Sequence, residues 1–389
     1  MTASTFRTSL CVSSYARDFP ADGTVYTDGH RVARTWTELQ DLFVAHGGNE
    51  IYFRLNTQKT STKRVGGVAL EDAMDFLHLA AARDLPVNPE VMCVGDYMDF
   101  MRQDAPDFDE WPELDLPSKP WSEYTLDEMC GALEAYGEAV ARRILSTGCR
   151  VNVWDLGNET NFGFAGVNLG LSTVVNPKLA RTHMMSVMAQ PGFGAAWLEK
   201  NIWRFNAEMF AAVASGIRKS DPAAVFSCHI STVTASPNYA ARYFTTMTAH
   251  GFDLAEAGVS FYPSAPGPFR DPMARFQKLV TRVREECGIP VFVSEYGYPS
   301  AKLARDAEFS SWSKPAPGYP LTPSGQEAFA TDVVQWGAEN GLSGIRPWAP
   351  DFLGGWEPMS LFEYDPSSRT ATSKPALAAF APNTIASDQ

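Results

Sequence analysis

One pattern recurs along the chain: a helix-like stretch ends at a glycine, and a short apolar run follows. Five copies of this pattern are marked by Gly47, Gly148, Gly251, Gly288 and Gly341. A glycine just past a helix adopts the left-handed conformation that ends the helix at little cost. Nearly continuous apolar strands that alternate with helices predict a parallel sheet covered on both faces.

The apolar runs can be extended to eight strands separated by helices. The strands are predicted near residues 8–13, 50–55, 86–93, 151–156, 224–230, 258–261, 290–294 and 344–348. Amphipathic helices are predicted at 36–45, 69–83, 126–145, 197–220, 239–250, 273–286 and 324–340. Eight β/α units favour an α/β fold of the (β/α)8 TIM-barrel type over a doubly wound open sheet. Since no linker or shift in composition is visible, residues 1–389 are predicted to form a single barrel domain.

Helix starts and long loops agree with this architecture. Three capping boxes are predicted, Thr35 with Glu38, Thr125 with Glu128, and Ser324 with Glu327, the last beside Pro323. The long irregular segments 95–124, 160–195 and 296–322 each follow a strand rather than a helix. In a barrel, the loops that follow strands gather at the C-terminal face, where active sites are built.

Composition excludes several classes of function. The formal net charge of −13 disfavours nucleic acid and anionic membranes as partners, because both are polyanions. No run of 18 apolar residues predicts a membrane span. The N-terminus shows no signal-peptide pattern, so the protein is expected to be cytoplasmic if the chain is complete and extracellular if a signal was removed. The six cysteines show no C-x-x-C, and most are expected to be reduced and buried, with one or two disulfides left open.

Two glutamates stand where predicted strands end. Glu159 closes the run 151–159, and Glu295 follows the run 289–294. The ends of the fourth and seventh strands of an eight-stranded barrel face each other across its mouth, so the two carboxylates are expected to meet there. A retaining glycosidase needs such a pair about 5–5.5 Å apart, one as acid/base and one as nucleophile. Asn158, just before Glu159, is placed to bind a sugar hydroxyl.

These residues carry a resemblance to a known family. Gly157-Asn158-Glu159-Thr160 and Ser294-Glu295-Tyr296-Gly297-Tyr298 resemble motifs of clan A glycoside hydrolases. With Gly258-Val-Ser-Phe-Tyr-Pro263 and the C-terminal segment 348–365, the chain is similar over nearly its whole length to glycoside hydrolase family 53, the endo-β-1,4-galactanases. The resemblance implies a (β/α)8 barrel, retention of anomeric configuration and no catalytic cofactor.

The resemblance also implies substrate-binding roles beyond the glutamates, for Asn158, Arg54, Asp96, His229, Tyr262, Trp348 and Trp356. Arg54 is expected to hold the surroundings of the nucleophile, and the hydroxyl of Tyr262 to bond the nucleophile itself. Trp348 is expected to form a platform under the sugar. His229 is matched to a histidine on the substrate side, although a strand histidine is more often simply packed.

The chain departs from the family pattern in two loops. The histidine and tryptophan that the family carries after its third strand are absent from Cys93–Met101, where Met98 stands instead. The segment Thr160–Ala165 replaces a Leu-Trp-Pro-like motif. Both loops shape sugar subsites in the family, so catalytic chemistry is expected to transfer better than galactan specificity. Some members bind a structural calcium after the seventh strand, but segment 296–322 lacks a compact ligand cluster, and no metal is predicted.

The sequence therefore predicts a retaining β-glycoside hydrolase that acts on a plant-type polysaccharide or oligosaccharide containing galactose or arabinose. One alternative is the same machinery acting on another β-glycoside from the chain end. A second alternative is a non-catalytic carbohydrate-binding barrel, which the two intact carboxylates disfavour. A metal-dependent barrel hydrolase lacks the expected ligand motif after the first strand.

Overall fold

The computed structural model describes residues 6–15, 17–60, 67–169, 184–233, 235–267, 270–307 and 309–381 of the 389. The chain forms two compact units, which are described separately. The terminal unit comprises Met1–Tyr52, Ser260–Thr281 and Pro290–Gln389, and the central unit comprises Phe53–Val259 and Arg282–Ile289. The assignment of residues 1–389 to one domain stays a prediction.

Eight strands make up the main sheet, which confirms the predicted (β/α)8 class. In sheet order they are β1 (Arg7–Thr8), β12 (Leu342–Pro347), β11 (Val291–Tyr296), β10 (Glu256–Phe261), β9 (Phe226–Ser231), β6 (Trp154–Leu156), β5 (Val87–Val91) and β4 (Ile51–Leu55). The pairs β1–β12, β11–β12, β5–β6 and β6–β9 are parallel. Every residue of β5, β6, β9, β10 and β11 is buried, as expected for strands covered on both faces.

The first predicted strand, 8–13, is wrong in extent. Only Arg7 and Thr8 form a strand, although the apolar residues that follow are buried. The N–H of Val12 donates to the side chain of Gln40 (3.1 Å), and that of Ser13 donates to Asp351 (3.1 Å). Because these donors bind side chains, the backbone leaves the ladder after its first residues.

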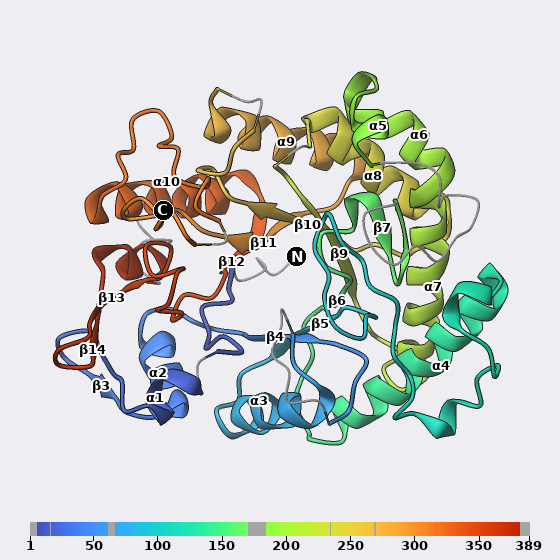
Figure 1. Ribbon diagram of the computed structural model, residues 1–389, viewed down its shortest axis with the longest axis horizontal. Coiled ribbons are helices and arrows are strands. Elements are labelled where there is room, and N and C mark those ends of the chain that lie inside the picture. The colour runs from blue at the N-terminus through green and yellow to red at the C-terminus, as the bar shows by residue number, and fades with distance from the viewer. Residues whose placement is uncertain are drawn as a thin grey trace. The chain divides into compact units, whose positions relative to one another are not determined.

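The central unit carries most of the helices. They are α3 (Leu70–Ala82), α4 (Leu126–Leu145), α5 (Met184–Met188), α6 (Ala195–Leu198), the π-helical turn η5 (Glu199–Trp203), α7 (Arg204–Arg218) and α8 (Pro237–Ala249). Short 3₁₀ turns η1 (Pro112–Leu114), η2 (Trp121–Glu123), η3 (Thr160–Phe162) and η4 (Pro191–Gly194) and the hairpin β7 (Gly163–Phe164) and β8 (Val167–Asn168) lie in its loops. Helices α4 and α7 pack side by side along their length (Figure 1).

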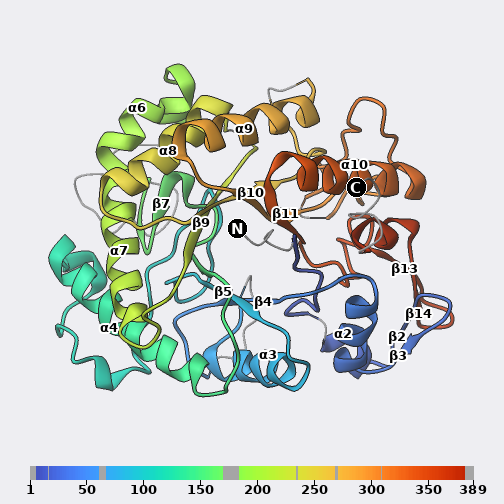
Figure 2. The same ribbon diagram turned by 180° about the vertical axis from the view of Figure 1, so that it is seen from behind.

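The terminal unit contains a second sheet that the sequence did not predict. Its order is β13 (Phe362–Asp365), β14 (Thr370–Ser373), β2 (Val25–Thr27) and β3 (Val32–Ala33). It lies beside α2 (Trp36–Ala45), as Figure 2 shows, and Tyr26 packs edge-on against Phe362 with ring centroids 5.0 Å apart. The other terminal helices are α1 (Asp18–Ala21), α10 (Pro323–Asn340) and the 3₁₀ turn η6 (Pro375–Phe380), whereas α9 (Pro272–Cys287) runs from this unit into the central one.

Two of the three predicted capping boxes are confirmed, and the third is wrong. Thr35 with Glu38 and Thr125 with Glu128 form both bonds of the motif at α2 and α4. Helix α10 instead begins after Thr322, whose hydroxyl accepts the N–H of Gly325. Pro323 occupies the first helical position, where a proline needs no hydrogen-bond partner, so the cap lies one residue before it rather than at Ser324.

The cysteines follow the main expectation from the sequence. All six are free, and Cys11, Cys93, Cys149 and Cys228 are buried. The described residues include no helix that is long and apolar enough to span a membrane.

Candidate active site

Glu159 lies in a strained turn directly after β6. Gly157 has φ +75°, and Glu159 itself adopts a left-handed conformation with φ +47° and ψ +51°. Such a conformation costs a residue other than glycine about 1–2 kcal/mol, so the surroundings must hold it in place. A side chain at Gly157 would lie 2.7 Å from Thr160 Cγ2, which explains why the turn begins with glycine.

Buried hydrogen bonds from η5, α7 and α8 hold this turn. The hydroxyl of Thr160 lies 2.6 Å from the hydroxyl of Tyr243, whose pKa burial raises well above its usual value. Asn206 donates to the carbonyl of Thr160 at 3.0 Å, and Trp203 Nε1 donates to the carbonyl of Asn161 at 2.8 Å. Together these bonds stabilise the strained backbone and fix the direction of the Glu159 side chain.

The loop after β5 lies against Glu159 and Asn158. The N–H of Phe100 donates to Glu159 Oε2 at 3.3 Å. Asn158 donates its backbone N–H to Met98 Sδ (3.1 Å) and its side-chain amide to the carbonyl of Met98 (2.7 Å). Gln103 donates to the carbonyl of Asn158 at 3.2 Å. Met98, which replaces an aromatic or histidine position of the resemblance, is therefore buried and holds the backbone of the turn.

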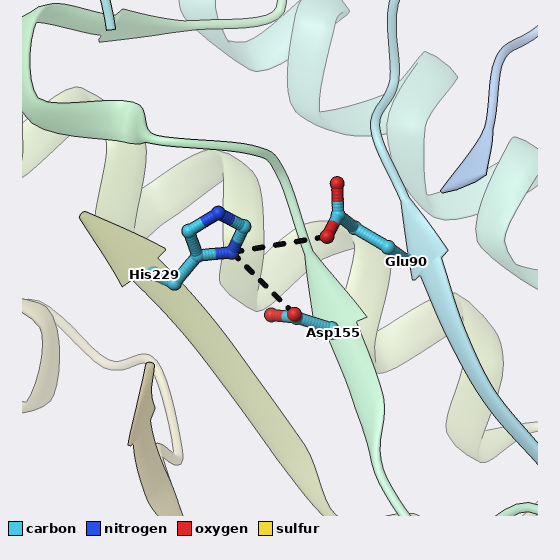
Figure 3. Close-up of side chains that lie close together, drawn as sticks. All are labelled: Glu90, Asp155 and His229. Carbon is cyan, nitrogen blue, oxygen red and sulfur yellow. Dashed lines mark ion pairs between the residues drawn. The ribbon is translucent and has the colours of Figure 1, made fainter. Parts of the chain in front are cut away.

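The side chain of Asn158 joins a buried polar network. Its Oδ1 accepts from Arg54 Nη2 (3.0 Å) and lies 2.8 Å from His229 Nε2. Arg54 Nε is 3.2 Å from Glu90 Oε1. His229 Nδ1 lies 3.4 Å from Asp155 Oδ2 and 3.9 Å from Glu90 Oε2, and the three side chains converge from neighbouring strands (Figure 3).

Glu295 ends the regular part of β11 and is 4% exposed. The hydroxyl of Tyr262 donates to its Oε2 at 2.6 Å. Gly297 allows the Tyr262 ring to lie close, because a Cβ there would lie 3.1 Å from Tyr262 Cε1. The backbone N–H of Trp348 donates to the carbonyl of Tyr296 at 2.9 Å, which ties the ends of β11 and β12 together after the register shift between Val293 and Tyr296.

An aromatic cluster surrounds Tyr262. Its ring lies 4.6 Å from that of Trp312 and 6.1 Å from that of Trp356. Trp348 meets Trp356 at 4.8 Å with an interplanar angle of 78°, and Phe309 contacts both Trp312 and Trp356. The indole N–H of Trp356 is buried without a hydrogen-bond partner. The predicted residues Tyr262, Trp348 and Trp356 thus lie together, with Glu295 bonded to the first of them.

A model of glycosyl hydrolase family 53 matches residues 19–364. The chain belongs to this family. It is therefore a glycoside hydrolase of the retaining class, which confirms the predicted activity and disfavours the non-catalytic alternative.

Solved structures of low sequence identity share the fold of this family 53 protein. A family 53 catalytic domain from Ignisphaera aggregans matches with a TM-score of 0.68 at 17% identity, over 96% of this chain and 95% of its own. Fungal β-1,4-galactanases match with a TM-score of 0.69 at 18% identity, over 97% and 99%. A family 10 glycoside hydrolase from Paenibacillus barcinonensis reaches 0.55 at 15% identity, over 99% and 97%.

Asp96 is placed differently from the other predicted residues of this family 53 protein. It is half exposed, and its Oδ2 lies 3.9 Å from Arg102 Nη2. Arg102 makes its shorter bonds to both oxygens of Asp104 (2.9 and 2.5 Å). Asp96 is therefore accessible to a ligand. None of the hydrogen bonds described above connects Asp96 to Glu159.

Several residues of the site were missed from the sequence. Glu90 and Asp155 lie inside apolar strands. A carboxylate in a buried strand needs a polar partner, so their positions in the sequence could have indicated a buried polar network. Trp312 and Phe100 lie in long loops, where no periodicity marks which side chain turns inward. Among the described residues, Glu90, Asp155 and His229 form the one group whose spacing suits a metal ion, a possibility that the sequence did not raise.

Proposed function

We propose that Glu295 is the nucleophile and Glu159 the acid/base of this glycoside hydrolase. Glu295 would attack the anomeric carbon while Glu159 protonates the departing oxygen, and Glu159 would then remove a proton from the water that releases the sugar. This mechanism requires the two carboxyl groups about 5–5.5 Å apart.

One observation carries the assignment of the nucleophile. The 2.6 Å bond from the Tyr262 hydroxyl supplies a strong donor to Glu295 Oε2. A donor of this kind stabilises the ionised form of a carboxyl group, and a nucleophile must be ionised to attack. The other oxygen, Oε1, is then the attacking atom.

The donor at Oε2 of Glu159, the proposed acid/base, is weaker than the donor at Glu295. The Phe100 N–H lies 3.3 Å from Glu159 Oε2, so this oxygen serves as an acceptor in both protonation states. The transferable proton therefore belongs on Oε1. Asn158, next to it in the turn, is assigned to a sugar hydroxyl through the amide hydrogen that Met98 does not accept.

The substrate is proposed to be a plant-type carbohydrate that contains β-linked galactose or arabinose. Fungal proteins of the same fold are β-1,4-galactanases, and the net charge of −13 supports a neutral substrate over nucleic acid or an anionic membrane. Met98, Phe162 and Phe164 are buried, so none of these three side chains offers a face to a sugar. Short or branched substrates are therefore preferred over linear β-1,4-galactan, and Trp348 and Trp356 are assigned to sugar contacts.

Covalent trapping tests the assignment. A 2-deoxy-2-fluoro-β-galactoside with a good leaving group should inactivate the enzyme with time, and peptide mapping should place the label on Glu295. Tyr262→Phe should be labelled more slowly. A label on any other carboxylate would remove Glu295 from the role. Product analysis tests specificity separately, since an early ladder of oligosaccharides from linear galactan would contradict the preference for short substrates.

A further inference from the structure

Chemistry alone fixes the orientation of the Asn158 amide. Arginine can only donate hydrogen bonds, so the atom 3.0 Å from Arg54 Nη2 must be the oxygen. A backbone carbonyl can only accept, so the atom 2.7 Å from the carbonyl of Met98 must be the nitrogen. The His229 nitrogen that lies 2.8 Å from the Asn158 oxygen must therefore carry a proton and donate it.

The second nitrogen of His229 faces negative charge. Its Nδ1 lies 3.4 Å from Asp155 Oδ2 and 3.9 Å from Glu90 Oε2 (Figure 3). A bare Nδ1 would point its lone pair at two carboxylates, which is unfavourable in a buried site. A second proton on the ring turns this repulsion into attraction. The geometry thus places a proton on both ring nitrogens.

Charge balance gives the same result. Arg54, Glu90, Asp155 and His229 come from β4, β5, β6 and β9, and the last three are fully buried. With His229 charged, the formal charges of these four groups sum to zero, whereas with a neutral ring they sum to −1. The neighbouring groups Cys228 and Tyr243 are neutral, because burial raises the pKa of each well above its usual value.

We propose that His229 is a positively charged positioning residue, which holds Asn158 for the substrate and is itself held by Glu90 and Asp155. It does not touch substrate, since its side chain is fully buried. This role replaces the direct substrate contact predicted from the sequence. The expected effect of His229 on kcat rests on the proposed function, in which Asn158 binds a sugar hydroxyl. Arg54 already supplies the positive charge beside Glu90 that a metal ion would otherwise provide.

Nitrogen-15 NMR of the histidine rings tests the charge without any substrate. The whole chain is labelled, and His229 is identified by its loss in His229→Gln. Both ring nitrogens of His229 should stay protonated from pH 5 to 8. In Asp155→Asn, His229 should begin to titrate within this range. A neutral ring at pH 7, or a response of its signals to added Zn²⁺ or to a chelator, would overturn the proposal.

Kinetics test the positioning role with a matched pair. His229→Gln keeps a donor near Nε2, whereas His229→Leu has none, and His78→Gln on the surface serves as control. His229→Leu should lose about 100-fold in kcat with little change in KM, because bonds to the sugar hydroxyl strengthen in the transition state. The kcat of His229→Gln should be at least ten times that of His229→Leu. Equal losses in the two folded variants would contradict the positioning role, while the NMR result would stand even if Glu159 and Glu295 proved to have other roles.

Discussion

The surroundings of Glu159 and Glu295 differ in kind. Glu159 lies in a left-handed turn held by buried polar side chains, and the backbone N–H of Phe100 lies 3.3 Å from its carboxylate. Glu295 lies in β11 beside an aromatic cluster, and the Tyr262 hydroxyl donates to it at 2.6 Å. A group that must take up and release protons suits a weak donor, while a group that must stay ionised suits a strong one. The comparison predicts how each site should fail.

The largest effect is expected at Glu295. Glu295→Ala should lose about 10³-fold or more in turnover on every substrate, because covalent catalysis is removed. The rate is measured with an aryl glycoside and a natural substrate, with folding checked by circular dichroism. Glu285→Ala, on an exposed face of α9, serves as control. Near-normal turnover in a folded Glu295→Ala protein would refute the assignment.

Glu159→Ala should show a loss that depends on the leaving group. Substrates with poor leaving groups should lose about 10²–10³-fold, and activated aryl glycosides much less, because the latter need little protonation. Added azide should restore part of the turnover by replacing the activated water. Equal losses on both kinds of substrate, with no effect of azide, would assign the acid/base role to another residue.

Two other buried carboxyl groups, Glu90 and Asp351, also differ in their surroundings. Glu90 lies against Arg54, whereas Asp351 in the terminal unit is buried and accepts the N–H of Ser13, and burial raises its pKa to about 6. The folded state holds the proton of the Asp351 carboxyl group more tightly than the unfolded chain does. The free energy of unfolding is therefore highest below about pH 4 and falls as the pH rises through about 6. The loss amounts to about 3 kcal/mol.

Asp351→Asn should remove this slope, as denaturant unfolding between pH 4 and 8 would measure. The exposed Asp109→Asn provides the control, because it keeps Asp351 in place. An unchanged slope in Asp351→Asn would show that other groups cause the pH dependence.

The smallest effects separate backbone strain from ring placement. Gly157→Ala should lower the free energy of unfolding by about 2 kcal/mol, from its positive φ and the contact with Thr160. Gly251→Ala, with φ +91° and open space, measures the cost of φ alone. Gly297→Ala should cost less stability but lower kcat about tenfold, since it displaces Tyr262. A Gly297→Ala variant with normal kcat would show that the ring position is unimportant.

The sequence predicted the eight strands, the first of them too long, and it placed both glutamates at strand ends, because a buried run that ends in a carboxylate is a local signal. Glu159's left-handed backbone was not predictable, since distant residues such as Asn206 and Trp203 hold it. The second sheet was missed because its strands have two to four residues, too few to show the alternation of apolar and polar residues that marks a strand. The cap of α10 was misplaced because Thr322 and Ser324 both suit an N-cap, and only the position of Pro323 decides between them.

The π-helical turn η5 has a consequence for how this family member can change by insertion or deletion. It stands between α6 and α7, at the place where Trp203 and, one turn later, Asn206 bond the turn at Glu159. Each residue added to an α-helix rotates the remainder of that helix by about 100°, so a π turn stores the extra residue without a loop. Deleting one residue within 199–202 would restore a continuous α-helix with both flanks near their present orientation, so Trp203 and Asn206 would keep facing the turn at Glu159. The π turn therefore makes this helix tolerant of losing one residue, whereas a deletion within α7 would rotate one side of that helix against the turn at Glu159.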